Sequence, residues 1–144
     1  MIDLTGAIRK ILAGLGAYAA GVQIKSTTID LNLAAGAHTL FTGTAQVVIL
    51  ESLVITMPND LASGITLTGI TIQTNDATPQ PLILAAQGLV ANLTAENQLT
   101  WEGKCRLGVG KLIQLTIAGG AEGAAYVCSV DVQYRAIVSG GILA

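Results

Sequence analysis

The sequence predicts an all-β fold, an antiparallel β-sandwich or jelly roll of eight or nine strands, with a barrel as the second possibility. From Val22 onward Thr, Val, Ile and Leu dominate, and Gly, Asn, Asp and Pro interrupt the pattern at short intervals. No helical period is evident there, so the crossover helices that parallel strands need are not expected. A chain of 144 residues is ordinary for one domain.

The first 22 residues do not follow this strand pattern. Five apolar residues recur there at the spacing of a helix face and predict a short amphipathic helix: Leu4, Ile8, Ile11, Leu12 and Leu15. A Gly/Ala-rich arm that ends near Gly21 is expected to follow. We therefore expect an N-terminal amphipathic arm at residues 1–22 and a β-sandwich domain at residues 23–144. Our hypothesis is that the five apolar side chains bind either a neighbouring subunit or the chain's own domain.

The arm has only a superficial likeness to a signal peptide or a membrane span. The apolar run after Lys10 is about a dozen residues long, whereas a membrane-spanning helix needs about 20. A signal peptide has a basic first region and an unbroken apolar run, but Asp3 lies in that region and Gly14 and Gly16 break the run. A membrane partner is therefore not expected.

The strands are expected where apolar residues alternate or run continuously between turn-forming residues. In chain order these segments are residues 26–33, 38–42, 45–57, 65–72, 82–86, 98–109, 111–117 and 125–138. The last segment alternates most regularly, and its inward side chains are expected to be Tyr126, Cys128, Val130, Val132 and Tyr134. Its polar side chains would then form one solvated face.

Residues 45–57 are apolar at almost every position, which is typical of a central strand covered on both faces, or covered on its outer face by a partner. Glu51 is the one charge in this segment. A lone carboxylate in a strand is more often an outward-facing residue with a Lys or Arg partner than a catalytic acid. We therefore expect an ion pair at Glu51.

The segment "ITLTGITIQTND" changes its apolar phase halfway. Ile65 and Leu67 are apolar at odd positions, whereas Ile70 and Ile72 are apolar at even positions. A β-bulge at Thr68-Gly69 would insert one extra residue and reverse the later side chains. The alternative is a strand covered on both faces. In either case "QTND" is expected to form the turn that follows.

The residues that could support catalysis or metal binding are few. The single histidine, His38, is expected to be an exposed residue at a turn-to-strand junction, because an isolated imidazole lacks partners for acid–base work. The acids do not single out a catalytic pair, and hydrolysis would require Glu51 to share a cleft with another acid. The loops "PND" and "TND" offer too few oxygen atoms for Ca²⁺, which takes about six to eight. We expect no enzyme activity, no cofactor and no metal.

The glycines at Gly108 and Gly110 do not form a phosphate-binding loop. They lack the spacing and the following helix that such a loop needs, so a tight turn is expected. Cys105 and Cys128 lie on the apolar phase of their strands and are expected to be buried free thiols, with one inter-strand disulfide as the alternative. Trp101 and Tyr134 lie on the apolar phase too and are expected in the core.

Composition predicts self-association. Hydrophobic residues make up 51% of the chain and charged residues only 11%, against about 25% in a typical soluble domain. A surface with so few charges is typical of a subunit that buries part of it against other chains. The net charge is −2 and the basic residues are scattered, so direct nucleic-acid binding is not expected.

Four stretches carry a resemblance to a known group of proteins. These are "STTIDLNLAAGAHTLFTGTAQVVILESLVITMPND", "LTGITIQTNDATPQPLI", "GLVANLTAENQL" and "GKLIQLTIAGGAEGAAYVCSVDVQYRAI". Together they resemble small head-region proteins of tailed bacteriophages over roughly residues 26 to 140. The resemblance implies a β-rich virion component, such as a decoration, cement or fibre-base subunit, often trimeric and seated on the capsid lattice. It implies no catalytic residues.

The leading hypothesis is a non-enzymatic virion structural protein. It would self-associate, with a trimer expected, and stabilise a capsid by packing apolar surface against the major capsid protein or another virion protein. It would be produced in the cytoplasm of the bacterial host and end in the virion. The alternative is a β-sandwich binding module on a phage fibre or tail that recognises a glycan or receptor, for which exposed aromatic residues in loops are expected.

Overall fold

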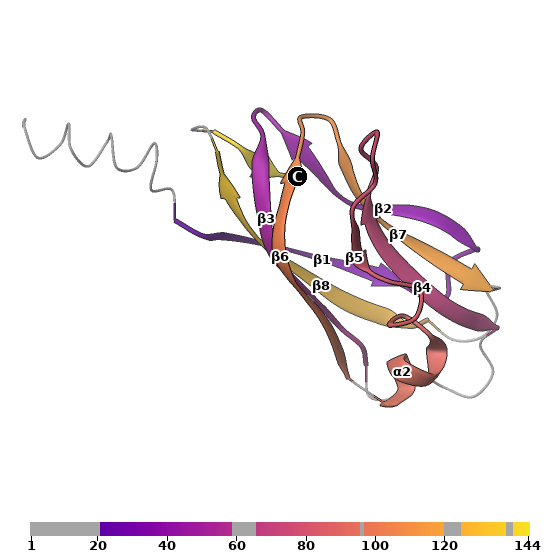
Figure 1. Ribbon diagram of the computed structural model, residues 1–144. Helices are drawn as coiled ribbons and strands as arrows, with labels where there is room; N and C mark the ends of the chain where they lie inside the picture. Colours follow the sequence, from indigo (N-terminus) through magenta and orange to yellow (C-terminus); the bar gives the residue numbers. More distant parts are fainter. Residues whose placement is uncertain (1–20, 59–65, 96, 120–124, 138–139) are drawn as a thin grey trace, which may run out of the picture.

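The computed structural model describes residues 21–58, 66–95, 97–119, 125–137 and 140–144, which form two β-sheets packed face to face (Figure 1). The elements are β1 (Gln23–Asp30), β2 (Gly36–Thr44), β3 (Val48–Thr56), β4 (Leu67–Thr74), β5 (Pro81–Ile83), α2 (Val90–Ala95), β6 (Gln98–Leu107), β7 (Leu112–Gly119), β8 (Val127–Ala136) and β9 (Ile142–Leu143). The expected all-β antiparallel sandwich is confirmed. Of the expected arm at residues 1–22, only residues 21 and 22 belong to the described part of the chain. The five apolar residues expected to bind a neighbour or the chain's own domain lie outside it.

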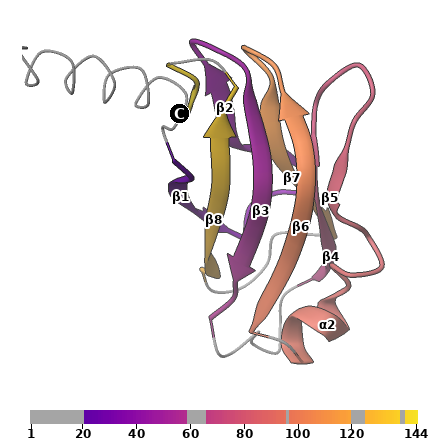
Figure 2. The same ribbon diagram turned by 60° about the vertical axis from the view of Figure 1, so that its left-hand side comes forward.

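The strand pairing is that of a jelly roll. The first eight strands form nested antiparallel pairs: β1 with β8, β2 with β7, β3 with β6, and β4 with β5. Rolling these pairs up gives a four-stranded sheet in the order β1-β8-β3-β6 and a five-stranded sheet in the order β5-β4-β7-β2-β9. Figure 2 shows the four-stranded sheet as one layer in front of the other. Of the two expected architectures, the jelly roll is the more specific description.

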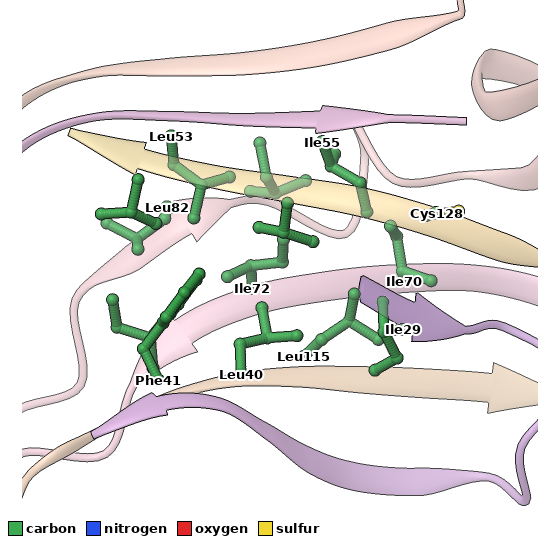
Figure 3. Close-up of a cluster of buried hydrophobic side chains, with 14 of the residues drawn as sticks. Ile29, Leu40, Phe41, Leu53, Ile55, Ile70, Ile72, Leu82, Leu115 and Cys128 are labelled. Atoms are coloured by element: carbon green, nitrogen blue, oxygen red, sulfur yellow. The ribbon is translucent and has the colours of Figure 1, made fainter. Parts of the chain in front are cut away.

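The core lies between the two sheets and is formed by one face of each. Leu53 and Ile55 of β3 point from the four-stranded sheet toward Ile72 and Leu115 of the five-stranded sheet (Figure 3). The regular alternation expected for β8 is confirmed, because all five side chains expected to point inward are buried: Tyr126, Cys128, Val130, Val132 and Tyr134. Burial of such apolar area is the main stabilising contribution to a fold of this kind.

The bulge expected in β4 is confirmed. The pairing of β4 with β7 shifts register between Leu67 and Gly69, so that one extra residue lies in β4. Leu67 before the shift and Ile70 and Ile72 after it are all buried in the core. Ile65, which defined the first phase in the sequence, lies outside the described residues. The strand ends at Thr74, so Gln73 and Thr74 of the expected turn "QTND" belong to β4 instead.

A second bulge lies in β3, where the sequence was interpreted as a strand covered on both faces. The pairing of β3 with β8 shifts register between Leu50 and Ser52. Because of this shift Leu50 and Leu53 both face the core, while Ile49 and Val54 face outward and remain half-exposed. Within the described residues, the outer face of β3 is therefore only partly covered by this chain.

One helix interrupts the strands, contrary to the expectation of none after Val22. The helix α2 has only six residues and too few apolar positions to show a helical period in the sequence. In its first turn the backbone N–H groups of Asn92 and Leu93 both donate to the carbonyl oxygen of Leu89, at 2.8 Å and 3.0 Å respectively. Leu93 is buried against the core and fixes the helix at the end of the sandwich, near the start of β4.

Candidate interaction surface

The charged side chains of the described strands all lie in one sheet. The strands β2, β4, β5, β7 and β9 of the five-stranded sheet contain no Asp, Glu, Lys or Arg. The four-stranded sheet carries all the strand charges: Lys25, Asp30, Glu51, Glu102, Lys104, Arg106, Asp131 and Arg135. Two further charges, Asp76 and Lys111, lie in the turns at one end of the five-stranded sheet. Within the described strands, the charges are thus confined to one side of the sandwich.

The outer side of the five-stranded sheet is a surface of Thr, Gln and Ala. Ile113, Leu115 and Ile117 of β7 point into the core, so the residues between them point outward. The register continues these outward positions into regular rows across three strands. One row is Thr71, Thr116 and Ala37, the next is Gln73, Gln114 and Thr39, and Gly69 pairs with Ala118. We call this surface, made of these residues together with Thr68 and Leu89, the uncharged face.

The uncharged face is hollowed beside the β4 bulge. The hollow has a volume of about 310 Å³, is mainly apolar, and is lined by Thr68, Gly69, Ile70, Thr71, Ala85, Leu89, Thr116 and Ala118. Its edge is the chain segment that connects β5 to α2. The backbone N–H of Ile70 donates to the carbonyl oxygen of Gly88 at 2.8 Å, and Gly69 forms an isolated antiparallel bridge with Leu89. The bulge thus brings this segment alongside β4, and the exposed Leu89 side chain stands beside the hollow.

The opposite side of the sandwich carries an ion-pair cluster at Glu51. Lys104 Nζ lies 2.8 Å and Arg135 Nε lies 3.2 Å from the same Glu51 Oε1 atom. The three side chains come from β3, β6 and β8, which are adjacent strands of one sheet. The expectation of an outward Glu51 with a Lys or Arg partner is confirmed, and Glu51 lies at the bulge between Leu50 and Ser52.

The ion pairs determine the protonation state of Glu51. Hydrogen bonds from Lys104 and then from Arg135 lower the pKa of the Glu51 carboxyl from 4.5 to about 2. Glu51 and Glu102 both line a shallow open hollow on this face, which is the arrangement that hydrolysis would require. A carboxylate with so low a pKa is neither a proton donor nor an effective proton acceptor near neutral pH. Glu51 therefore does not supply the acid with a raised pKa that catalysis by paired carboxylates uses.

The two cysteines are buried free thiols, as expected. Burial, followed by the nearby charge of Asp30, raises the pKa of Cys128 to about 12. Burial, with a smaller contribution from Asp76, also raises the pKa of Cys105. Thiols with raised pKa values are poor nucleophiles at neutral pH, because the thiolate is the reactive form. Their role in this structure is to fill the core.

His38 and Trp101 differ in part from what the sequence predicted. His38 lies near the expected turn-to-strand junction, as the third residue of β2, but it is half-buried rather than exposed, and its Nε2 donates to the carbonyl oxygen of Ala34 at 2.9 Å. Trp101 packs against the core but is only half-buried, because β6 is an edge strand of its sheet. Its ring lies over Gly103, where a Cβ would come within 2.7 Å of it. Tyr134 is buried in the core as expected.

The described residues show neither a metal-ligand cluster nor a long apolar helix. They contain no group of three or more His, Cys, Asp or Glu side chains placed to hold a metal ion. In the turn "TND", Asn75 Oδ1 instead accepts a hydrogen bond from the backbone N–H of Leu112 at 2.7 Å. The "PND" loop lies mostly outside the described part of the chain. No helix in the described ranges is long and apolar enough to cross a membrane.

Comparisons with known proteins give a structural match but no sequence family. No protein-family profile and no curated protein matches this sequence. The fold is similar to a chain of the acidic stable capsid structure of Helicobacter pylori bacteriophage KHP30, with a TM-score of 0.57 and 10% identity, over 87% of this chain and 94% of that one. A chain of the infectious bursal disease virus VP2 subviral particle gives a TM-score of 0.31 at 8% identity, over 84% of this chain and 39% of that one. The first of these matches shows a shared fold across nearly the whole of both chains.

The uncharged face was not identified from the sequence. The sequence shows a low charge for the whole chain. Each strand must be assigned to a sheet before it is clear that the strand charges lie in one sheet and not in the other. A signal was nevertheless present, since the segments "HTLFT", "LTGITIQT" and "LIQLTIAG" each contain no charge while the segments between them do.

Proposed function

We propose that this protein is a non-enzymatic structural component of a bacteriophage virion, of the decoration, cement or fibre-base type. The observation that carries the proposal is the fold similarity to a chain of a phage capsid structure over nearly the full length of both chains. Jelly rolls occur in viral capsid proteins, lectins and cupins, so the fold alone does not select a function. Within this group of functions, the surface supports the virion proposal.

The surface supports assembly rather than catalysis. The candidate acid pair on the four-stranded sheet is held by Lys104 and Arg135, and both thiols are buried. The uncharged face, by contrast, is a broad outer surface with no charge to desolvate when another protein covers it. Such a subunit stabilises a particle by burying neutral and apolar surface at its contacts. Its partners would be further copies of itself and the major capsid protein or another virion protein.

The alternative, a module that recognises a glycan or receptor, predicted exposed aromatic side chains in loops. Among the described residues, Phe41, Tyr126 and Tyr134 are buried and Trp101 is half-buried. No observation in the described part of the chain favours this alternative over the virion proposal.

The virion role is tested on particles purified from the phage whose genome encodes the chain. We expect mass spectrometry to find the protein in the particles as a repeated component. Its absence from purified particles would refute the proposal. For the cement role, particles that lack the protein are expected to release DNA at a lower temperature than complete ones. An unchanged release temperature would leave a virion protein without a cementing role.

The arm hypothesis is tested separately by deleting residues 1–21. The expected result is weaker attachment to particles with an unchanged unfolding temperature of the β-sandwich. A matched control replaces only the five apolar residues of the arm, Leu4, Ile8, Ile11, Leu12 and Leu15, by Ser. Attachment equal to that of the full chain in both variants would exclude the arm as an anchor.

A further inference from the structure

We propose that the uncharged face is a self-association surface on which a second copy of this chain packs by the same face. This inference rests on the virion proposal, in that it names the surface and the partner for one of the contacts of the subunit. It goes beyond that proposal in requiring a two-fold contact, which is distinct from the trimer expected from the resemblance.

The charge distribution favours a second copy as the occupant. In a two-fold contact each surface meets itself, so a surface with a net charge repels its partner. The strands of the five-stranded sheet carry no Asp, Glu, Lys or Arg, so the described residues of this face can meet their copies without burying or opposing charges. Complementary charges commonly give a contact with a different protein its specificity, and the described strands of this face offer none for that purpose. The strands of the four-stranded sheet, with Glu51, Lys104 and Arg135 on one side, provide such charges instead.

The shape of the face also fits a two-fold contact. A self-complementary surface needs a projecting group and a recess on the same side of the molecule. The recess is the hollow of about 310 Å³ lined by Gly69, Thr116 and Ala118. Leu89 lines one edge of the hollow and has 51% of its surface exposed, so it is the apolar group that a partner at this edge can contact. Around a two-fold axis the Leu89 side chain of each copy would enter the hollow of the other, which buries apolar area on both sides.

The contact is tested with Thr116→Lys in the full chain, measured by sedimentation velocity over a range of concentrations. Thr116 points outward from the middle of the face, and a lysine there would oppose its copy across the contact. The matched control is Thr100→Lys, which points outward from β6 on the other sheet. We expect the wild type and Thr100→Lys to associate equally. We expect Thr116→Lys to raise the dissociation constant at least about tenfold, because a buried unpaired charge costs more than 1.4 kcal/mol.

A second variant distinguishes the loss of the contact from a folding defect. Leu89→Lys changes an exposed side chain outside the strands, and it is expected to weaken association to a similar extent with no change in unfolding temperature. An equimolar mixture of Thr116→Lys and Thr116→Glu is expected to recover association, because the two faces then carry opposite charges. Recovery would support packing of this face on itself.

Three outcomes would overturn the inference: a wild type that remains monomeric at every concentration, association of Thr116→Lys and Leu89→Lys equal to that of Thr100→Lys, or a mixture that associates no better than either variant alone. These measurements are made in solution and do not depend on the virion role. A protein that is found in particles but is monomeric in solution would refute the contact alone. A protein that associates as expected but is absent from particles would refute the virion role alone.

Discussion

The backbone N–H of Ile70 donates a hydrogen bond of 2.8 Å to the carbonyl oxygen of Gly88, and no side chain can be placed at Gly88 without displacing this pair. A Cβ built on Gly88 would overlap the carbonyl oxygen of Ile70, which is backbone and cannot rotate away. The contact holds the segment between β5 and α2 against the β4 bulge. The wall of the hollow on the uncharged face depends on it.

We predict that Gly88→Ala lowers the free energy of unfolding by about 2 kcal/mol, because the new methyl group forces the two backbones apart. The control is Gly110→Ala, whose Cβ would meet no atom within 4 Å. Gly110 has a φ of 73°, so this control should lose only about 1 kcal/mol through backbone strain. Urea unfolding of both variants measures the difference. Equal losses in the two variants would show that the close approach at Gly88 is not the cause.

The Glu51 cluster predicts a pH dependence of stability. The pKa of Glu51 is about 2 in the folded chain and 4.5 when unperturbed, so ionised Glu51 favours the folded state. Its contribution is fully present above pH 4.5 and is lost as the pH falls toward 2. The difference in unfolding free energy between the wild type and Glu51→Gln should therefore be constant near neutral pH and shrink through this window.

High salt provides the control for this prediction. The Lys104 side chain is largely exposed, so the attraction to Glu51 is screened and the difference between wild type and Glu51→Gln should be smaller in 1 M salt. A difference that stays constant from neutral pH down to pH 2 would show that the ion pairs do not stabilise the fold.

The two thiols are predicted to react at different rates with an alkylating reagent near neutral pH. Cys128 lies on β8, which is bonded to strands on both sides, whereas Cys105 lies on β6 at the edge of the same sheet. Edge strands open by local unfolding more readily than central ones. Mass spectrometry should find Cys105 modified first, and Cys128 modified only at the rate of global unfolding. Equal rates would show that both thiols become accessible only through global unfolding, or that local opening exposes both.

Thr74 is predicted to stabilise the turn after β4. Its side chain has no exposed surface, and its Oγ1 accepts a hydrogen bond from the backbone N–H of Gln80 at 3.0 Å. Thr74→Val keeps the shape but removes the acceptor, so we expect a loss of about 1 kcal/mol in the free energy of unfolding. Thr71→Val on the uncharged face is the control and should change stability by less. A loss at Thr71 as large as at Thr74 would point to a general effect of Val rather than to the hydrogen bond.

The bulges show how far the sequence could predict the fold. In β4 the flip of phase from Leu67 to Ile70 was sufficient to locate the bulge, because Gly69 marked the position. In β3 the same flip occurs from Leu50 to Leu53, but Ile49 and Val54 on the outer face are apolar too and mask it. A change in the phase of the apolar residues can be recognised in a sequence only where the residues of the opposite face are polar.

The uncharged face could not be predicted for a different reason. Strand type and turn position depend on local pattern, and those predictions were mostly confirmed. Which strands share a sheet depends on the nested long-range pairing of β1 with β8 and β2 with β7. The sequence shows charged and uncharged segments in turn, but only this topology places the uncharged ones side by side. The helix α2 was missed because six residues are too short to display a helical period.

The separation of charge between the two sheets makes the two sides of the molecule chemically different. An approaching neighbour meets a salt-sensitive side formed by the four-stranded sheet or a salt-insensitive side formed by the other. Ionic conditions can therefore loosen contacts on one side of the subunit while leaving those on the other unchanged. If the proposed assembly forms, contacts through the two sheets would therefore differ in their response to salt.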